Sequence, residues 1–153
     1  MPADFLPVTR VLFPEDKDLK DSGCSLPFIY CERAFVYMDI KLYDEAIKDC
    51  NKAIELYPKN TEAYYARGLA YDRKSEYDSA IENYTKAIEF NLKTIQPTPS
   101  FIPDSYVYAY YNRGIIYSKK GDRDRAIKDL KKAVDLRSQE ARKTLKEFFD
   151  IDY

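Results

Sequence analysis

Apolar residues recur at helical spacing through residues 61–94. They form two sets, and each set returns every three or four positions, which is the spacing of one face of an α-helix. The first set is Tyr64, Gly68 and Tyr71, and the second is Ala80, Tyr84 and Ala87. A polar stretch, residues 75–78, separates the two sets. The pattern therefore predicts two amphipathic helices joined by a short turn.

The same pattern occurs three times. Eleven residues between Tyr30 and Glu55 recur unchanged 34 positions later, and a third copy lies 46 positions beyond the second. The twelve residues 95–106 are thus an insertion, either a proline-stiffened connection or a lip over the neighbouring surface. A fixed period predicts a stack of hairpins in which each covers apolar surface of the next.

The ends of the chain depart from the period. Residues 139–149 keep helical spacing and predict a helix that caps the last copy, so we assign 141–153 to a capping helix and tail. Residues 1–26 contain three prolines and are followed directly by Pro27, and this composition predicts an extended or partly helical segment. Pro58 should end the second helix of the first copy, whereas Leu92 at the same place predicts a longer helix in the second.

The copies resemble tetratricopeptide repeats, at residues 27–60, 61–94 and 107–140 within a unit spanning 27–140. The matching residues in the second copy are Tyr64, Gly68, Tyr71, Ala80, Tyr84 and Ala87. Arginine replaces the more usual leucine in all three copies, and this Tyr-x-x-Arg-Gly/Ala-x-x-Tyr variant resembles bacterial members. The resemblance implies an all-α fold, a right-handed α-solenoid of three helical hairpins with a C-terminal capping helix.

The three replaced positions are Arg33, Arg67 and Arg113. A half-buried guanidinium needs an acceptor, because an unpaired buried charge is costly. The second helices offer matching acceptors, listed in order of the copies as Asp49, Asn83 and Asp129. We predict internal contacts with these acceptors. The alternative is a row of arginines that holds a phosphate or a carboxylate.

Charge and composition exclude several function classes. The chain has 25 basic and 26 acidic residues, which disfavours nucleic acid and anionic membrane surfaces as partners. It has no histidine, four glycines and no CxxC pair among three cysteines. Most catalytic, phosphate-loop and zinc patterns are therefore missing. We expect a cytoplasmic, non-catalytic protein without metal or cofactor.

The resemblance implies that the first helix of each hairpin lines a concave groove for a peptide or helix of a protein partner. The predicted groove residues are Phe28, Glu32, Phe35, Asp39, Tyr65, Leu69, Arg73, Tyr108, Tyr111, Asn112, Ile115 and Lys119. The family's carboxylate-clamp places hold Cys31, Phe35, Ala66, Tyr108 and Asn112, so none matches the clamp. We expect an apolar partner segment. Two alternatives are a small secretion-type chaperone for hydrophobic substrates and a self-assembling architectural protein, and either could form homo-oligomers.

Overall fold

The computed structural model describes residues 25–94 and 103–153, which form seven α-helices and no strand. Most of the predicted segments 1–26 and 95–106 lie outside the described residues. The helices are α3 (Leu26–Asp39), α4 (Tyr43–Leu56), α5 (Thr61–Arg73), α6 (Tyr77–Thr94), α7 (Asp104–Lys119), α8 (Arg123–Asp135) and α9 (Gln139–Phe149). Among these residues, no helix has the length and apolar character needed to cross a membrane.

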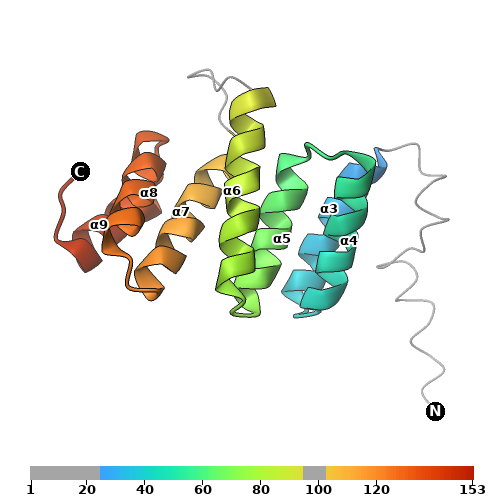
Figure 1. Cartoon of the computed structure of the whole chain (residues 1–153), viewed down its shortest axis with the longest axis horizontal. Coiled ribbons are helices and arrows are strands. Elements are labelled where there is room, and N and C mark those ends of the chain that lie inside the picture. The colour runs from blue at the N-terminus through green and yellow to red at the C-terminus, as the bar shows by residue number, and fades with distance from the viewer. Residues whose placement is uncertain (1–24, 95–102) are drawn as a thin grey trace, which may run out of the picture.

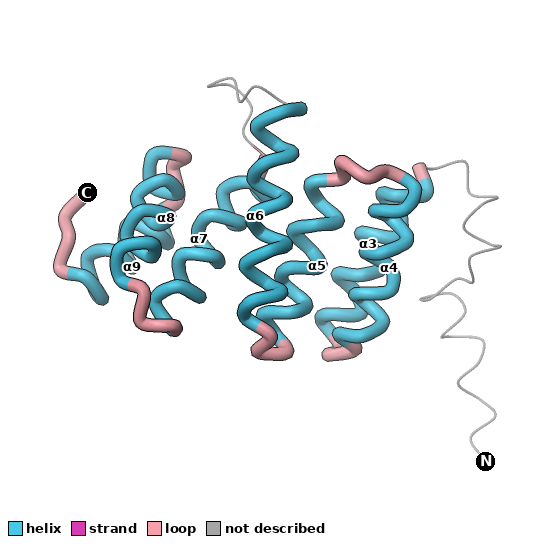
Figure 2. The backbone as a smooth tube through the Cα atoms, in the orientation of Figure 1, coloured by secondary structure: helices cyan, strands magenta, loops and turns pink. Residues whose placement is uncertain are grey.

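The helices pack as hairpins stacked in a row (Figure 1). The hairpins are α3 with α4, α5 with α6, and α7 with α8, and α9 packs against α8 at the C-terminal end (Figure 2). The first helices of the hairpins also contact one another, α3 with α5 and α5 with α7. The predicted all-α repeat fold is confirmed. One face of the stack is thus built from α3, α5 and α7.

Each hairpin turns through the same backbone conformation. Lys41, Ser75 and Gly121 occupy equivalent places and have φ angles of 62°, 62° and 79°. In each turn the next amide bonds a carbonyl near the helix end, as Glu76 N does with Tyr71 O at 2.9 Å. A left-handed residue at this place satisfies the carbonyls that the ending helix leaves unpaired. The third turn uses glycine, which adopts this conformation without steric cost.

Small residues let the two helices of a hairpin approach closely. The fully buried alanines of the second helices are Ala46, Ala53, Ala80, Ala87, Ala126 and Ala133. Gly68 provides the tightest contact, since a Cβ atom built there would lie 2.8 Å from Cδ1 of Tyr84. One core cluster joins α5 and α6 to α7 and includes the fully buried Tyr84.

Two helix limits test the sequence predictions. α6 has 18 residues against 14 for α4, so the predicted longer helix is confirmed. α7 begins at Asp104, inside the predicted insertion, and its N-cap is Pro103, which makes no side-chain capping bond. Asp104 and Ser105, residue types that often cap helices, lie inside α7 instead. The helix starts inside the insertion because Tyr106 is buried in the core. The negative charge of Asp104 in the first turn also interacts favourably with the helix dipole.

The last helix covers the end of the third hairpin. α9 spans Gln139–Phe149, the range whose spacing predicted a helix, and the Ser138 side chain accepts a hydrogen bond from Ala141 N at 3.1 Å. Its buried residues include Ala141, Leu145 and Phe149, which join the apolar cluster of α8. α9 thus shields apolar surface that a further repeat would otherwise cover.

Candidate functional site

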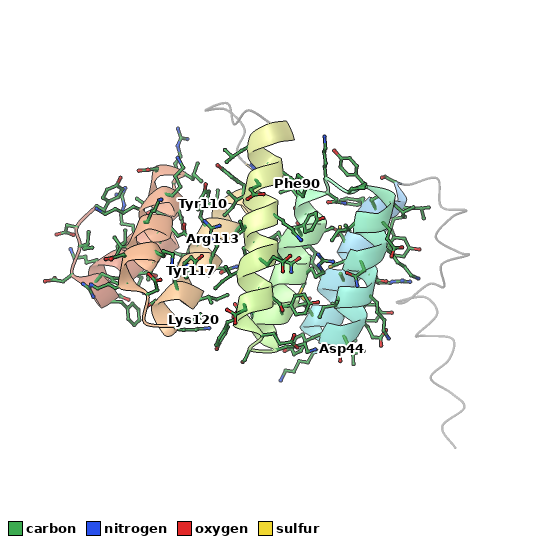
Figure 3. The ribbon with its side chains drawn as sticks, in the orientation of Figure 1. Asp44, Phe90, Tyr110, Arg113, Tyr117 and Lys120 are labelled. Atoms are coloured by element: carbon green, nitrogen blue, oxygen red, sulfur yellow. The ribbon has the colours of Figure 1, made fainter. Side chains whose placement is uncertain are left out.

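The repeated arginines are held inside the fold. Arg33 donates from Nε and Nη2 to the two carboxylate oxygens of Asp49 at 2.6 and 2.7 Å. Arg113 contacts both oxygens of Asp129 in the same way, at 2.7 and 2.9 Å. Figure 3 shows Arg113 between Tyr110 and Tyr117 on α7. The predicted arginine to aspartate contacts are confirmed.

In the second copy, asparagine side chains accept the hydrogen bonds of the arginine. Arg67 donates to Asn83 Oδ1 at 2.7 Å and to Asn51 Oδ1 at 2.5 Å. Asn51 belongs to the preceding hairpin, as does Thr85, whose hydroxyl accepts from Arg113 at 2.8 Å. Sequence reasoning missed these second acceptors. The guanidinium groups of Arg67 and Arg113 therefore each connect two neighbouring hairpins.

Four of the predicted groove residues meet in one pocket on the face made by α3 and α5. The pocket has a volume of about 280 Å³. Its lining residues are Phe35, Met38, Asp39, Lys41, Tyr43, Leu69 and Arg73. Its apolar lining residues are buried or half-buried, and its charged lining residues are exposed. The pocket can hold an apolar side chain and fix the direction of the segment that carries it.

The Tyr65 side chain is half-buried and packs against the core instead of standing free on the surface. Its ring centroid is 6.0 Å from that of Tyr84. Burial raises the pKa of the Tyr65 hydroxyl to about 12, the Glu62 carboxylate adds to the shift, and the Asn112 side chain opposes it. Burial also raises the pKa of Tyr84, whose hydroxyl has no hydrogen-bond partner of ordinary geometry among the described residues. Tyr65 therefore packs against the core that α5 shares with α6 and α7.

The predicted residues of α7 are divided between packing and the surface. Tyr111 and Ile115 are half-buried against the cluster that α8 and α9 share. Lys119 lies 3.7 Å from a carboxylate oxygen of Asp72, and its Nζ is 5.2 Å from the Tyr77 ring centroid. Tyr108 keeps 38% of its surface exposed. Of the aromatic and aliphatic residues in this group, Tyr108 is the most exposed.

A second pocket lies where α3 and α5 begin. Its volume is about 230 Å³. The lining residues are Ser25, Pro27, Phe28, Cys31, Tyr57, Asn60 and Glu62. The sequence prediction included Phe28 and missed Glu62. The signal was present, because the repeat offsets place Phe28, Glu62 and Tyr108 at equivalent positions.

The two described cysteines lie in the interior of the fold. Cys31 and Cys50 are buried and free. Burial raises the pKa of the Cys31 thiol to about 12 and raises that of Cys50 as well. A protonated thiol is a poor nucleophile and metal ligand at neutral pH. Within residues 25–94 and 103–153, no group of three cysteine, aspartate or glutamate side chains is placed to hold a metal ion.

Comparison with known proteins identifies the repeat. The model of the tetratricopeptide repeat family matches residues 27–60, 61–92 and 107–140. The protein SGT1 homolog of rice is 42% identical over 52 residues, which are 34% of this chain and 14% of that protein. This chain therefore corresponds to a small part of the length of that relative.

Solved structures show the same architecture. The crystal structure of MamA is 29% identical, covers 86% of this chain and 68% of its own, and superposes with a TM-score of 0.64. The first TPR of Spaghetti (RPAP3), solved with the HSP90 peptide SRMEEVD, is 23% identical and covers 82% of this chain and 91% of its own, with a TM-score of 0.69. The likeness to the second structure concerns the fold alone.

Proposed function

Because the chain belongs to the tetratricopeptide repeat family, we propose that it is a non-catalytic interaction module that binds an apolar peptide or helix of a partner protein. The binding surface is the concave face formed by α3, α5 and α7. The observation that carries the proposal is the pocket between α3 and α5, where Phe35 and Leu69 are bordered by Asp39 and Arg73. A few apolar anchors in such pockets supply most of the binding energy in protein interfaces.

The residues at the clamp positions favour an apolar segment over a terminal carboxylate. Cys31 and Ala66 are fully buried, and Phe35 lines the pocket. A carboxylate ligand needs cationic or amide donors at these places, and of the five residues there only Asn112 carries an amide. The buried free thiols are typical of a reducing compartment, and we place the module in the cytoplasm.

The proposal is tested with a displayed library of random twelve-residue peptides selected against the full chain. We expect peptides with apolar anchors to be enriched. Phe35→Ala should weaken the Kd of a selected peptide at least tenfold, because it removes the wall of the pocket, and Arg73→Glu should change which peptides are selected. Phe148→Ala is the matched control, since Phe148 is 74% exposed on α9, away from the pocket.

Two results would contradict the proposed function. One is a library that yields no enriched peptide, and the other is a set of selected peptides that bind Phe35→Ala as tightly as the unaltered chain. Circular dichroism of each variant checks that the helices are retained. If Phe148→Ala weakened binding as much as Phe35→Ala, the binding surface would lie at the C-terminal end.

A further inference from the structure

The pocket where α3 and α5 begin differs in chemistry from the one that Phe35 lines. Two aromatic rings border it, and both are accessible: Phe28 is 61% exposed and Tyr57 is 45% exposed. Glu62 provides the only charged side chain among its described lining residues. An aromatic surface beside a carboxylate is the environment that a cationic side chain prefers.

The carboxylate of this pocket belongs to an acidic region. Burial raises the pKa of Glu62, the Ser105 hydroxyl opposes the shift, and the carboxylates of Glu32 and Asp104 raise it further. The charged groups that perturb Glu62 are thus both negative. Its place in the first turn of α5 suits the helix dipole, as does that of Asp104 in α7, but Glu32 lies mid-helix in α3, where the dipole gives no reason for an acid.

Resting on the proposed function, we propose that this pocket holds a lysine or arginine side chain of the partner segment, placed between the Phe28 ring and the Glu62 carboxylate. Glu32, exposed on the same face, adds to the attraction. The ring contributes a cation–π contact and the carboxylate a charge-assisted hydrogen bond. The partner's positive charge also relieves the repulsion among the three carboxylates. This ligand chemistry is opposite in charge to that of an acidic peptide.

The two pockets set a spacing for the partner. Phe28 and Phe35 are seven residues apart on α3, so they are separated by about 10 Å along the helix axis at 1.5 Å per residue. An extended peptide rises about 3.3 Å per residue, so roughly three residues cover this distance. The expected recognition pattern is therefore a basic residue about three positions from an apolar anchor.

The peptides selected from the random library test this inference directly. In the full chain we expect lysine or arginine to be enriched two to four positions from the apolar anchor. Replacing that residue by neutral citrulline or norleucine should weaken Kd at least tenfold. In Glu62→Gln combined with Glu32→Gln, the same replacement should change Kd by less than about threefold, because both proposed carboxylate partners of the basic side chain are gone. The tenfold loss corresponds to about 1.4 kcal/mol.

Matched controls separate this effect from general charge. Glu89→Gln removes an exposed carboxylate of α6 and should leave the tenfold difference intact. The acidic peptide SRMEEVD should bind more weakly than any selected basic peptide. Raising the salt concentration should weaken the basic peptide more in the full chain than in the double variant.

The outcomes distinguish the inference from the function on which it rests. Peptides that depend on Phe35 but show no basic preference would overturn the inference and leave the proposed function standing. An equal loss of affinity on citrulline replacement in the double variant would overturn it too, because the peptide's charge would then be recognised by residues other than Glu62 and Glu32. Absence of any Phe35-dependent peptide would contradict both.

Discussion

The second and third repeats use the same arginine in different surroundings. Arg113 is held by the carboxylate of Asp129, with Thr85 as a further acceptor. Arg67 is held by two neutral amides, those of Asn83 and Asn51. In both repeats the guanidinium donors at this place are therefore hydrogen-bonded. A carboxylate accepts these bonds in the third repeat, whereas amides accept them in the second.

In these two repeats a glycine follows the arginine, and its surroundings are a second difference between them. A Cβ atom at Gly68 would lie 2.8 Å from the Tyr84 ring, whereas one at Gly114 would lie 3.1 Å from Cγ of Leu130. The larger residue opposite Gly68 fills more of the space between the helices. The two repeats thus keep one helix geometry through different pairs of side chains, and substitutions in each should have different costs.

The largest expected effect is that of Asp129→Ala. The side chain of Asp129 is 7% exposed, and its removal leaves the half-buried Arg113 without its carboxylate partner. Breaking a buried ion pair costs about 3–5 kcal/mol, so we expect a loss of that order in the free energy of unfolding, measured in urea. Asn83→Ala should cost less, about 1–3 kcal/mol, because Arg67 loses a neutral acceptor and keeps Asn51.

Asp129→Asn sharpens this comparison. It gives the third repeat the amide acceptor of the second. The free energy of unfolding of Asp129→Asn should therefore lie between that of Asp129→Ala and that of the unaltered chain. Equal losses for Asp129→Ala and Asn83→Ala would show that the charge pair does not distinguish the two repeats.

A smaller effect is expected from Gly68→Ala. The added methyl group must displace the fully buried Tyr84 ring, and overpacking of this kind costs about 1–3 kcal/mol. Alanine gains up to about 1 kcal/mol in helix propensity, so Gly114→Ala, whose contact is looser, should be nearly neutral. Tyr84→Leu, which copies the third repeat, should reduce the cost of Gly68→Ala in a double-mutant cycle. Similar costs for the two glycine variants would exclude the Tyr84 ring as the cause.

Much of this comparison is visible in the sequence. The 34-residue period places Asp49, Asn83 and Asp129 at one position, and this position alone predicted an acceptor for each arginine. Asn51 and Thr85 were not predicted, because they contact the arginine of the next repeat and become relevant only when the hairpins are stacked.

The candidate site was harder to predict for a physical reason. Packing between repeats and the concave face use adjacent positions of the same helices, so helical spacing does not tell how deep a side chain lies. Tyr65 and Tyr111 were assigned to the groove and are half-buried. Glu62 was not predicted, although its repeat equivalents Phe28 and Tyr108 were.

The smallest expected effect comes from the hairpin turns. Ser75 has a φ of 62° at the place where the third repeat has Gly121. For a residue with a Cβ atom, this conformation is unfavourable by about 1–2 kcal/mol. Glycine avoids this steric cost, but the greater conformational entropy of its unfolded chain lowers stability by about 0.5–1 kcal/mol. Ser75→Gly should therefore raise the free energy of unfolding in urea by up to about 1 kcal/mol, and Gly121→Ser should lower it by a similar amount. A loss of stability in Ser75→Gly would mean that the Ser75 turn carries no strain that glycine relieves, and the two turns would then be equivalent despite their sequences.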